Sequence, residues 1–139
     1  MSEFSGAKGA VFFGDKLLVY LRDDKPELRY ANMWDFPGGG REGDETPQEC
    51  FFREAKEEFS LNVKPEQIVW QKEYPSMDDP GRIAHFFVVR VPEEEIAHIV
   101  FGDEGQRWEL VDPQEFLSRE DAVPRLKTRL SDYLASVLT

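Results

Sequence analysis

The chain has 139 residues, and its 17 basic and 28 acidic side chains give a formal net charge of −11 at pH 7. A chain of this length forms one domain with one substantial hydrophobic core, so we expect a single domain over residues 1–139. The 40% hydrophobic and 13% aromatic content excludes a disordered acidic segment, which would be poor in both classes of residue.

Three further classes of protein are disfavoured by the same sequence. It lacks a signal-peptide pattern and the ~20 consecutive apolar residues of a membrane span, so we expect a cytoplasmic protein with no membrane partner. Its acidity argues against binding to a nucleic acid polymer, which requires a basic surface. The single cysteine, Cys50, excludes an internal disulfide and a zinc site built from several thiolates.

The first part of the chain has the pattern of a β-hairpin followed by a loop. Apolar runs at 10–13 and 17–21 flank the dipeptide Gly14-Asp15, which is typical of a tight turn and predicts two antiparallel strands. Residues 22–33 are polar and contain a proline, and the segment that follows them is dense in glycine and acidic residues. Both stretches therefore predict loop.

A helix start is clearly marked after the glycine-rich segment. Thr46 is the expected N-cap, Pro47 falls at the first helical position, and Glu49 completes a T-x-x-E capping box. These signals predict a helix over residues 47–59.

The second half of the chain contains further strands and one more long helix. β-branched and aromatic residues predict strands near 68–74 and 83–91, and a short strand at 108–111. Residues 113–117 predict a single turn, and the i, i+4 spacing of leucines over 124–138 predicts an amphipathic helix. Strands interleaved with two substantial helices predict an α/β sandwich with a mixed sheet.

Three acidic side chains lie on one side of the helix predicted over 47–59. At 100° per residue, Glu54, Glu57 and Glu58 fall within an arc of about 100°, beside the apolar stripe that would face the core. Like charges at these spacings repel by roughly 0.2–0.5 kcal/mol per pair. They form either a solvated acidic surface or the ligands of a hard divalent cation, and geometry alone leaves both interpretations open.

The segment 39–61, GGREGDETPQECFFREAKEEFSL, decides between these interpretations. It resembles the Nudix box, the family pattern G-x5-E-x7-R-E-U-x-E-E-x-G-U, in which U is an aliphatic residue. Chance agreement at the six matching fixed positions is on the order of one in ten thousand for the whole chain. Ser60 replaces the last glycine of the pattern, which concerns the end of the helix and removes no proposed ligand. The matching residues are Gly39, Glu45, Arg53, Glu54, Ala55, Glu57, Glu58 and Leu61.

The resemblance extends more weakly to residues 34–39 and 104–106 and covers most of the chain. It implies the α/β/α sandwich of the Nudix fold, and hydrolysis of a nucleoside diphosphate-linked compound with Mg²⁺, or alternatively Mn²⁺, as cofactor. The partner would be a small-molecule nucleotide, and we favour a nucleoside triphosphate cleaved to monophosphate and pyrophosphate. The alternatives left open are ADP-ribose or a dinucleotide as substrate, or a catalytically silent nucleotide-binding module, and a homodimer is also left open.

The resemblance also implies roles for individual residues. Glu57 and Glu58 are expected metal ligands, and Glu54 is either a third ligand or the general base. Arg53 is expected to orient Glu57 by hydrogen bonding, so Glu54, Arg53 and Glu57 form the catalytic set. Glu45 is expected to stabilise the loop or the helix start. The full set of expected metal ligands is Gly38 through its carbonyl, Glu54, Glu57, Glu58 and Glu104.

Candidates for substrate binding are Arg22, Arg82 and Gly39. Arg22 could bind a phosphate through two parallel hydrogen bonds, and Arg82 is similar to a substrate-contacting arginine in relatives that act on nucleoside triphosphates. For both, an ordinary surface arginine at a strand end is the commoner case. Gly39 and its glycine neighbours also fit a turn that requires positive φ.

The remaining chemically notable residues have structural interpretations. Trp34 and Phe36 could stack on a base, but aromatic residues beside a glycine loop usually belong to the core. His85 and His98 have no second histidine or cysteine near them in the sequence, so structural or surface roles are expected for both. Cys50 is expected to be a packed thiol.

Overall fold

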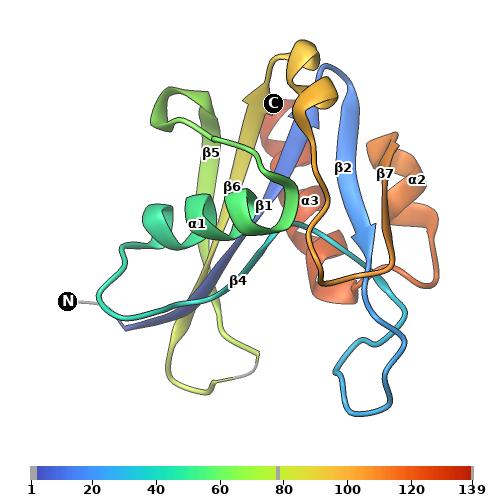
Figure 1. The fold of residues 1–139 in the computed structure, drawn as a ribbon. Helices are drawn as coiled ribbons and strands as arrows, with labels where there is room; N and C mark the ends of the chain where they lie inside the picture. Colours follow the sequence, from blue (N-terminus) through green and yellow to red (C-terminus); the bar gives the residue numbers. More distant parts are fainter. Residues whose placement is uncertain (1–2, 78, 139) are drawn as a thin grey trace.

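The computed structural model describes residues 3–77 and 79–138 (Figure 1). Its strands are β1 (Phe4–Phe13), β2 (Lys16–Leu21), β3 (Trp34–Asp35), β4 (Gly38–Gly40), β5 (Ile68–Pro75), β6 (Ile83–Val91) and β7 (Arg107–Val111). Its α-helices are α1 (Pro47–Phe59), α2 (Pro113–Ser118) and α3 (Pro124–Val137), and short 3₁₀ helices span Pro65–Gln67 and Glu93–His98. None of the helices in this described part is both long and apolar enough to cross a membrane.

The strands form one mixed sheet in the order β3-β2-β1-β6-β5, with β4 paired to β1 and β7 paired to β2. β1 and β6 run parallel, and the other pairs are antiparallel. Helix α1 covers one face, and α2 and α3 cover the other (Figure 1). This three-layer arrangement confirms the predicted α/β/α sandwich with a mixed sheet.

Each face of the sheet has its own hydrophobic core, because β1 and β2 are apolar on both sides. The core under α1 contains Phe51, Ala55 and Phe59, the stripe expected from the helical periodicity. The core under the other helices contains Phe116 of α2 and Leu126 of α3. Burial on both sides therefore fixes α1 and α3 on opposite faces of the same strands.

The hairpin strands β1 and β2 pair only beside their turn, at Phe12↔Leu17 and Phe13↔Lys16. Farther from the turn, β1 pairs with β4 instead, in the register Lys8↔Gly38. The two hairpin strands therefore separate along the sheet, and β4 takes the place of β2 beside β1. The candidate site lies along this stretch of β1 and β4.

The glycine-rich segment differs from its prediction as a loop, since it contains the short strands β3 and β4. Gly38 has φ of 137°, and a Cβ there would lie 2.3 Å from the carbonyl oxygen of Ala7. Close approach of β4 to β1 therefore requires glycine, a residue with poor strand propensity. The predicted hairpin, the helix α1, the later strands and the C-terminal helix are confirmed, although β1 begins earlier, at Phe4.

Candidate active site

Hydrogen bonds of the capping residues set where helix α1 begins and ends. The Thr46 Oγ1 accepts a hydrogen bond from the Glu49 N–H (3.1 Å), and Glu49 Oε1 accepts one from the Thr46 N–H (2.8 Å), which confirms the capping box. At the other end, Ser60 has φ of 59°, and its N–H donates to the Lys56 carbonyl (2.9 Å). The helix thus ends with a left-handed residue even though serine stands where the Nudix box has glycine.

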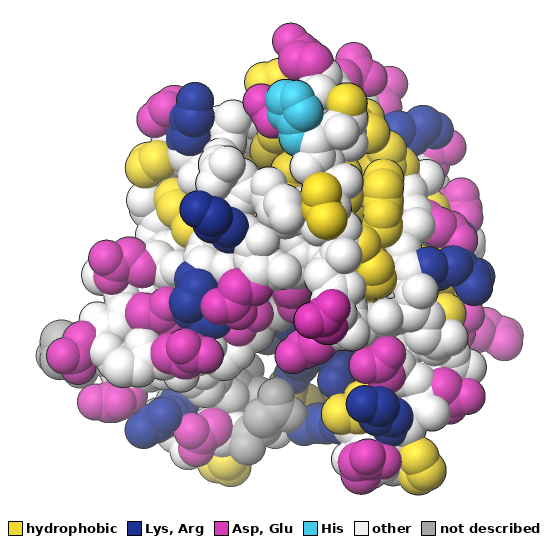
Figure 2. Space-filling model, in the orientation of Figure 1, with side chains coloured by type: hydrophobic (Ala, Val, Ile, Leu, Met, Phe, Trp, Pro, Cys, Tyr) yellow, Lys and Arg dark blue, Asp and Glu magenta, His cyan; other side chains and the backbone are white. Residues whose placement is uncertain are grey.

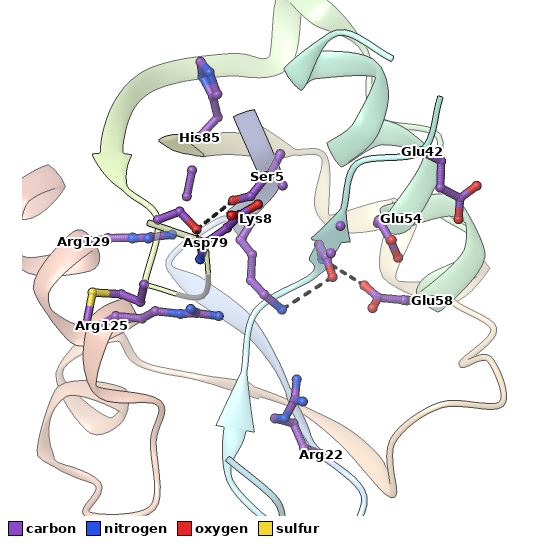
Figure 3. Close-up of a pocket in the computed structure, with 18 of the residues that line it drawn as sticks. Ser5, Lys8, Arg22, Glu42, Glu54, Glu58, Asp79, His85, Arg125 and Arg129 are labelled. Carbon is purple, nitrogen blue, oxygen red and sulfur yellow. Dashed lines mark hydrogen bonds between the residues drawn. The ribbon is translucent and has the colours of Figure 1, made fainter. Parts of the chain in front are cut away.

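The three glutamates of the predicted acidic arc line one cavity of about 680 Å³, together with residues of β1 and β4. Figure 3 shows Glu54 and Glu58 on one side of it. The Glu57 side chain is 57% exposed, whereas that of Glu54 is 16% exposed and Glu58 is buried. Figure 2 shows acidic side chains gathered in a band across this face, with a hollow beneath them. The three glutamates therefore form a partly buried wall of the cavity and not a fully solvated acidic surface. We call Glu54, Glu57 and Glu58 the glutamate wall.

Burial changes the electrostatics of two of these carboxyl groups. It raises the pKa of Glu58 to about 8, against the opposing effects of nearby Lys8 and of the Gly38 N–H, which donates to Glu58 Oε1 at 3.0 Å. Burial also raises the pKa of Glu54, and the charge of Glu57 adds to that increase. Negative charge at this wall is therefore unfavourable until a cation compensates it.

Arg53 joins the loop before α1 to the glutamates. Its guanidinium donates to Glu45 through Nε (2.6 Å) and Nη2 (3.2 Å), and to the Gly40 carbonyl through Nη2 (2.9 Å). Its Nη1 donates to Glu54 (3.3 Å) and Glu57 (3.2 Å). One planar side chain thus sets the positions of two glutamates relative to the glycine strand.

The loop before β7 brings Glu104 to the same wall. The Gly102 N–H donates to the Glu58 carbonyl (2.8 Å), which anchors the loop on the end of α1. A second cavity, of about 180 Å³, lies between this loop and the three α1 glutamates, and Asp103 and Glu104 both line it. Glu104 also lines the main cavity.

The donor set of this wall fits a hard divalent cation. It consists of carboxylate oxygens and a backbone carbonyl, the ligands that Mg²⁺ and Mn²⁺ prefer. A Cβ at Gly39 would lie 2.4 Å from Glu54 Oε2, so the glycine leaves the room that this carboxylate occupies. Within the described residues no three acidic, histidine or cysteine side chains lie close enough together to form a metal site by themselves. The residues that could hold the ion are Gly38 through its carbonyl, Glu54, Glu57, Glu58 and Glu104.

The two arginines predicted to bind substrate lie in different places. Arg22 lines the main cavity, and its Nη1 donates to Asp35 at 2.9 Å. Arg82 does not line that cavity and instead lies 3.3 Å from Asp79 and 3.6 Å from Glu3. The structure therefore brings Arg22, and not Arg82, to the glutamates.

Sequence analysis missed a buried ion pair in the cavity wall. Lys8 Nζ donates to Asp35 Oδ2 (2.8 Å) and lies 3.4 Å from the Gly38 carbonyl oxygen. Burial raises the pKa of Asp35, but the stronger opposing effect of Lys8 and Arg22 leaves it below its ordinary value. A lone lysine in the apolar strand FSGAKGAVFF was the available signal.

Two arginines of α3, Arg125 and Arg129, also line the cavity and were missed. They lie four residues apart, so they project from the same side of the helix. That spacing was visible in the sequence, but nothing in it indicated that α3, which packs on the face of the sheet opposite α1, would line the same cavity as the glutamates.

The other candidates are mostly structural, as expected. Trp34 and Phe36 are buried in the core, and burial raises the pKa of the Cys50 thiol to about 11, which makes it unreactive. His98 is exposed and pairs with Glu95. His85 lines the cavity, and burial lowers its pKa.

Comparison with known proteins agrees with this geometry. The family model described as NUDIX domain matches residues 6–133. An RNA pyrophosphohydrolase of Marinomonas sp. (strain MWYL1) is 39% identical over 56 residues, which cover 37% of this chain and 35% of that protein. An RNA pyrophosphohydrolase of Hydrogenovibrio crunogenus is 30% identical over 81 residues, 58% of this chain and 42% of the relative. The matched segments thus span less than half of either relative.

Among solved structures, the MutT protein of Methanosarcina mazei Go1 has the same fold. It superposes with a TM-score of 0.78 at 19% identity, covering 99% of this chain and 98% of that one. The family model matches nearly the whole chain, and its signature segment carries the clustered glutamates described above. The chain belongs to the Nudix family.

Proposed function

We propose that this protein hydrolyses a phosphoric anhydride bond of a nucleoside diphosphate-linked compound, with Mg²⁺ bound at the glutamate wall, in the cytoplasm. The observation that carries the proposal is that four glutamates and one backbone segment line the same cavity: Glu54, Glu57, Glu58, Glu104 and Gly38. Mn²⁺ is the alternative ion, since it accepts the same oxygen ligands.

The chain's own groups divide the work of such a reaction. Glu57 and Glu58 hold the ion, and Glu54 is either a third ligand or the base that takes a proton from the attacking water. Arg53 positions Glu54 and Glu57 through its hydrogen bonds. When bound, the ion neutralises charge on the phosphoryl oxygens and activates water.

We propose a nucleoside triphosphate, cleaved to the monophosphate and pyrophosphate, as the leading substrate. The cavity volume of about 680 Å³ suits a ligand of nucleotide size, and Arg22 and Lys8 supply positive charge beside the glutamates. The cavity is lined by no Asn or Gln among the described residues, which supports modest discrimination between bases.

A second candidate substrate is a triphosphate at the 5′ end of an RNA. Both curated relatives are named RNA pyrophosphohydrolase, which suggests this substrate. The cavity lining also includes two arginines of α3, Arg125 and Arg129. ADP-ribose or a dinucleotide remains the third alternative.

The test is a set of specificity constants at one Mg²⁺ concentration for the common nucleoside triphosphates, 8-oxo-dGTP, ADP-ribose and a 5′-triphosphorylated RNA, with products identified. We expect several triphosphates to be hydrolysed, with less than about a hundredfold difference between bases. A preference above about a thousandfold for 8-oxo-dGTP, or for ADP-ribose over every triphosphate, would contradict the assignment.

Measuring both binding and turnover of the same ligand distinguishes an enzyme from a catalytically silent nucleotide-binding module. Calorimetric titration that shows nucleotide binding with Mg²⁺, together with no product after prolonged incubation, would establish the silent module. Binding accompanied by Mg²⁺-dependent product formation supports the enzyme.

A further inference from the structure

The backbone of Gly38, which lines the cavity beside the glutamate wall, is held from two sides. Its N–H donates to Glu58 Oε1 of α1 at 3.0 Å, and its carbonyl accepts a hydrogen bond from Lys8 Nζ of β1 at 3.4 Å (Figure 3). A backbone carbonyl oxygen has two lone pairs, so the bond from Lys8 leaves one lone pair for a cation. The ammonium of Lys8 and a bound cation can therefore use the same oxygen.

Lys8 lies directly against Gly38 because β1 and β4 pair there. The register is Lys8↔Gly38, and a Cβ on Gly38 would lie 2.5 Å from the Lys8 Cα and 2.9 Å from its Cγ. The Lys8 side chain is only 12% exposed. Its ammonium is therefore confined beside the Gly38 carbonyl and largely shielded from water.

The three N–H donors of the Lys8 ammonium all have acceptors within the protein. The shortest bond goes to Asp35 Oδ2 (2.8 Å), and two longer bonds go to the carbonyl oxygens of Phe36 (3.3 Å) and Gly38 (3.4 Å). An ammonium has no fourth donor, so a phosphate group of the substrate would have to displace one of these acceptors. The arrangement favours a role of Lys8 in holding the backbone over direct contact with the substrate.

Three successive carbonyl groups before the glutamate wall are bound to β1. The Pro37 carbonyl accepts from the Gly9 N–H (2.9 Å), and the carbonyls on either side of it, of Phe36 and Gly38, accept from Lys8. Lys8 thus supplies two of the three hydrogen bonds that orient these carbonyl groups. The same peptide segment carries the Gly38 N–H that holds Glu58.

The charge of Lys8 acts on a cation in the direction opposite to its hydrogen bond. An ammonium beside a ligand oxygen repels a divalent cation bound to that oxygen, although the Asp35 carboxylate compensates part of this charge at 2.8 Å. The hydrogen bond instead holds the ligand in place, and groups that orient metal ligands typically contribute roughly 10- to 100-fold to metal affinity. We therefore expect the effect on ligand position to exceed the repulsion.

We propose that Lys8 is a positioning residue of the metal site, which holds the Gly38 carbonyl and, through the Gly38 N–H, the carboxylate of Glu58 in place for the cation. This inference rests on the proposed function, since it requires a divalent cation at the glutamate wall. It places a determinant of metal affinity on β1, outside the segment 39–61 that resembles the Nudix box.

The experiment measures the dissociation constant of Mn²⁺ in the absence of nucleotide, from the electron paramagnetic resonance signal of the free ion. Lys8→Met keeps most of the apolar stem and removes the ammonium. Its dissociation constant should rise roughly 10- to 100-fold above that of the wild type. If Lys8 acted through its charge alone, the constant would fall, because a repelling cation is removed. The two roles therefore predict changes of opposite sign.

Arg22→Met is the matched control. It removes one positive charge from the same Asp35 carboxylate, which Arg22 Nη1 contacts at 2.9 Å, and leaves the hydrogen bond between Lys8 and Gly38 in place. Both variants should melt at a lower temperature, because each leaves the buried carboxylate with one cation fewer. Mn²⁺ binding by Arg22→Met should be unchanged or tighter. Loss of affinity in Lys8→Met alone then separates positioning from general destabilisation.

The double variant Lys8→Met/Asp35→Asn keeps the test decisive if the single variant fails to fold. Asparagine retains an oxygen for the Phe36 N–H, which donates to Asp35 Oδ1 at 2.7 Å, and needs no counter-charge. One positive and one negative charge are lost, so the net charge of the pair is unchanged. The Mn²⁺ dissociation constant should again rise roughly tenfold or more, whereas a role through charge alone predicts little change.

Three results would overturn the positioning role. They are an unchanged or lower Mn²⁺ dissociation constant in either folded Lys8 variant, an equal loss of affinity in Arg22→Met, and a raised KM for the nucleotide at saturating Mg²⁺ with unchanged Mn²⁺ affinity. The last result would assign Lys8 to the phosphate groups of the substrate.

Failure of the proposed function gives a different pattern. Absence of Mn²⁺ binding by the wild type would contradict the proposed function and this inference together. Mn²⁺ binding that depends on Lys8, without hydrolysis of any nucleotide, would support the inference and contradict the enzyme. Wild-type binding and hydrolysis with Mn²⁺ affinity unaffected by Lys8→Met would overturn the inference alone.

Discussion

Replacing Arg53 by lysine should weaken both the fold and catalysis, although the positive charge is kept. The guanidinium contacts Glu45 through two nitrogens, the Gly40 carbonyl, Glu54 and Glu57, at 2.6 to 3.3 Å. A lysine ammonium has no planar fork and cannot reproduce the paired contact with Glu45 while reaching Gly40 and Glu57.

The size of the effect follows from these contacts. The Arg53 side chain is 20% exposed and that of Glu45 17% exposed, so their hydrogen bonds are mostly shielded from water. Loss of about two hydrogen bonds, each worth roughly 1–1.5 kcal/mol net, lowers the free energy of unfolding by about 2–3 kcal/mol. For a chain of this size that corresponds to a melting temperature lower by roughly 6–12 °C.

The kinetic effect should appear in kcat, because Arg53 positions two glutamates and is not placed to contact the substrate directly. We expect kcat to fall by roughly 10- to 100-fold, with KM changed by less than about threefold, as for other residues that orient metal ligands. Steady-state kinetics at saturating Mg²⁺ and thermal unfolding measure the two effects on the same preparation.

Arg41→Lys is the matched control from the same segment. The Arg41 Nε donates one hydrogen bond to the Glu45 carbonyl (3.1 Å), and its guanidinium lies over the Phe4 ring at 4.5 Å. It should cost at most about 1 kcal/mol and leave kcat unchanged. If Arg53→Lys resembled this control in both stability and kcat, the positioning role would be refuted.

Three further predictions follow from individual residues. Ser60→Gly should raise the melting temperature by the equivalent of at most about 1 kcal/mol, because glycine removes the left-handed strain while losing only the hydroxyl bond to Val100; a lowered value would contradict this. Glu104→Gln should lower kcat strongly and Asp103→Asn only slightly, so equal losses would reject a specific role for Glu104. Because the folded pKa of Asp35 is lowered, its carboxylate stabilises the fold above its ordinary pKa of about 4 and loses that effect as pH falls below it. Denaturant unfolding should therefore show Asp35→Asn destabilised by a few kcal/mol at pH 7 and by up to about 1 kcal/mol less at pH 3, because one group changes the free energy of unfolding by at most about 1.4 kcal/mol per pH unit. A difference independent of pH would count against the ion pair.

The elements that the sequence predicts well are those decided by local chemistry. The start of α1 depends on Thr46, Pro47 and Glu49, which lie within one helical turn of each other. The β1–β2 turn depends on Gly14, which has φ of 60°, and Asp15. These signals act between residues that are close in the sequence and do not depend on tertiary contacts, so the elements they predict are present in the folded protein.

The features that the sequence does not predict depend on contacts between distant segments. β4 consists of glycines with little strand propensity, and it pairs because β1 lies beside it. Helical periodicity placed Glu58 beside the core stripe, but its burial depends on the Gly38 segment that covers it. Arg125 and Arg129 line the cavity through the packing of α3 on the face opposite to α1, a contact that the local sequence does not indicate.

The central claim is that the glutamates of α1 hold a divalent cation that is required for hydrolysis. The most direct measurement is pyrophosphate release from a nucleoside triphosphate as a function of Mg²⁺ concentration for the wild type, Glu57→Gln and Glu58→Gln, with metal-free melting temperatures recorded in parallel. We predict that both variants lose at least about a hundredfold in activity at low-millimolar Mg²⁺ and melt at or slightly above the wild-type temperature, because like-charge repulsion is relieved. Activity close to wild type in either folded variant would contradict the claim.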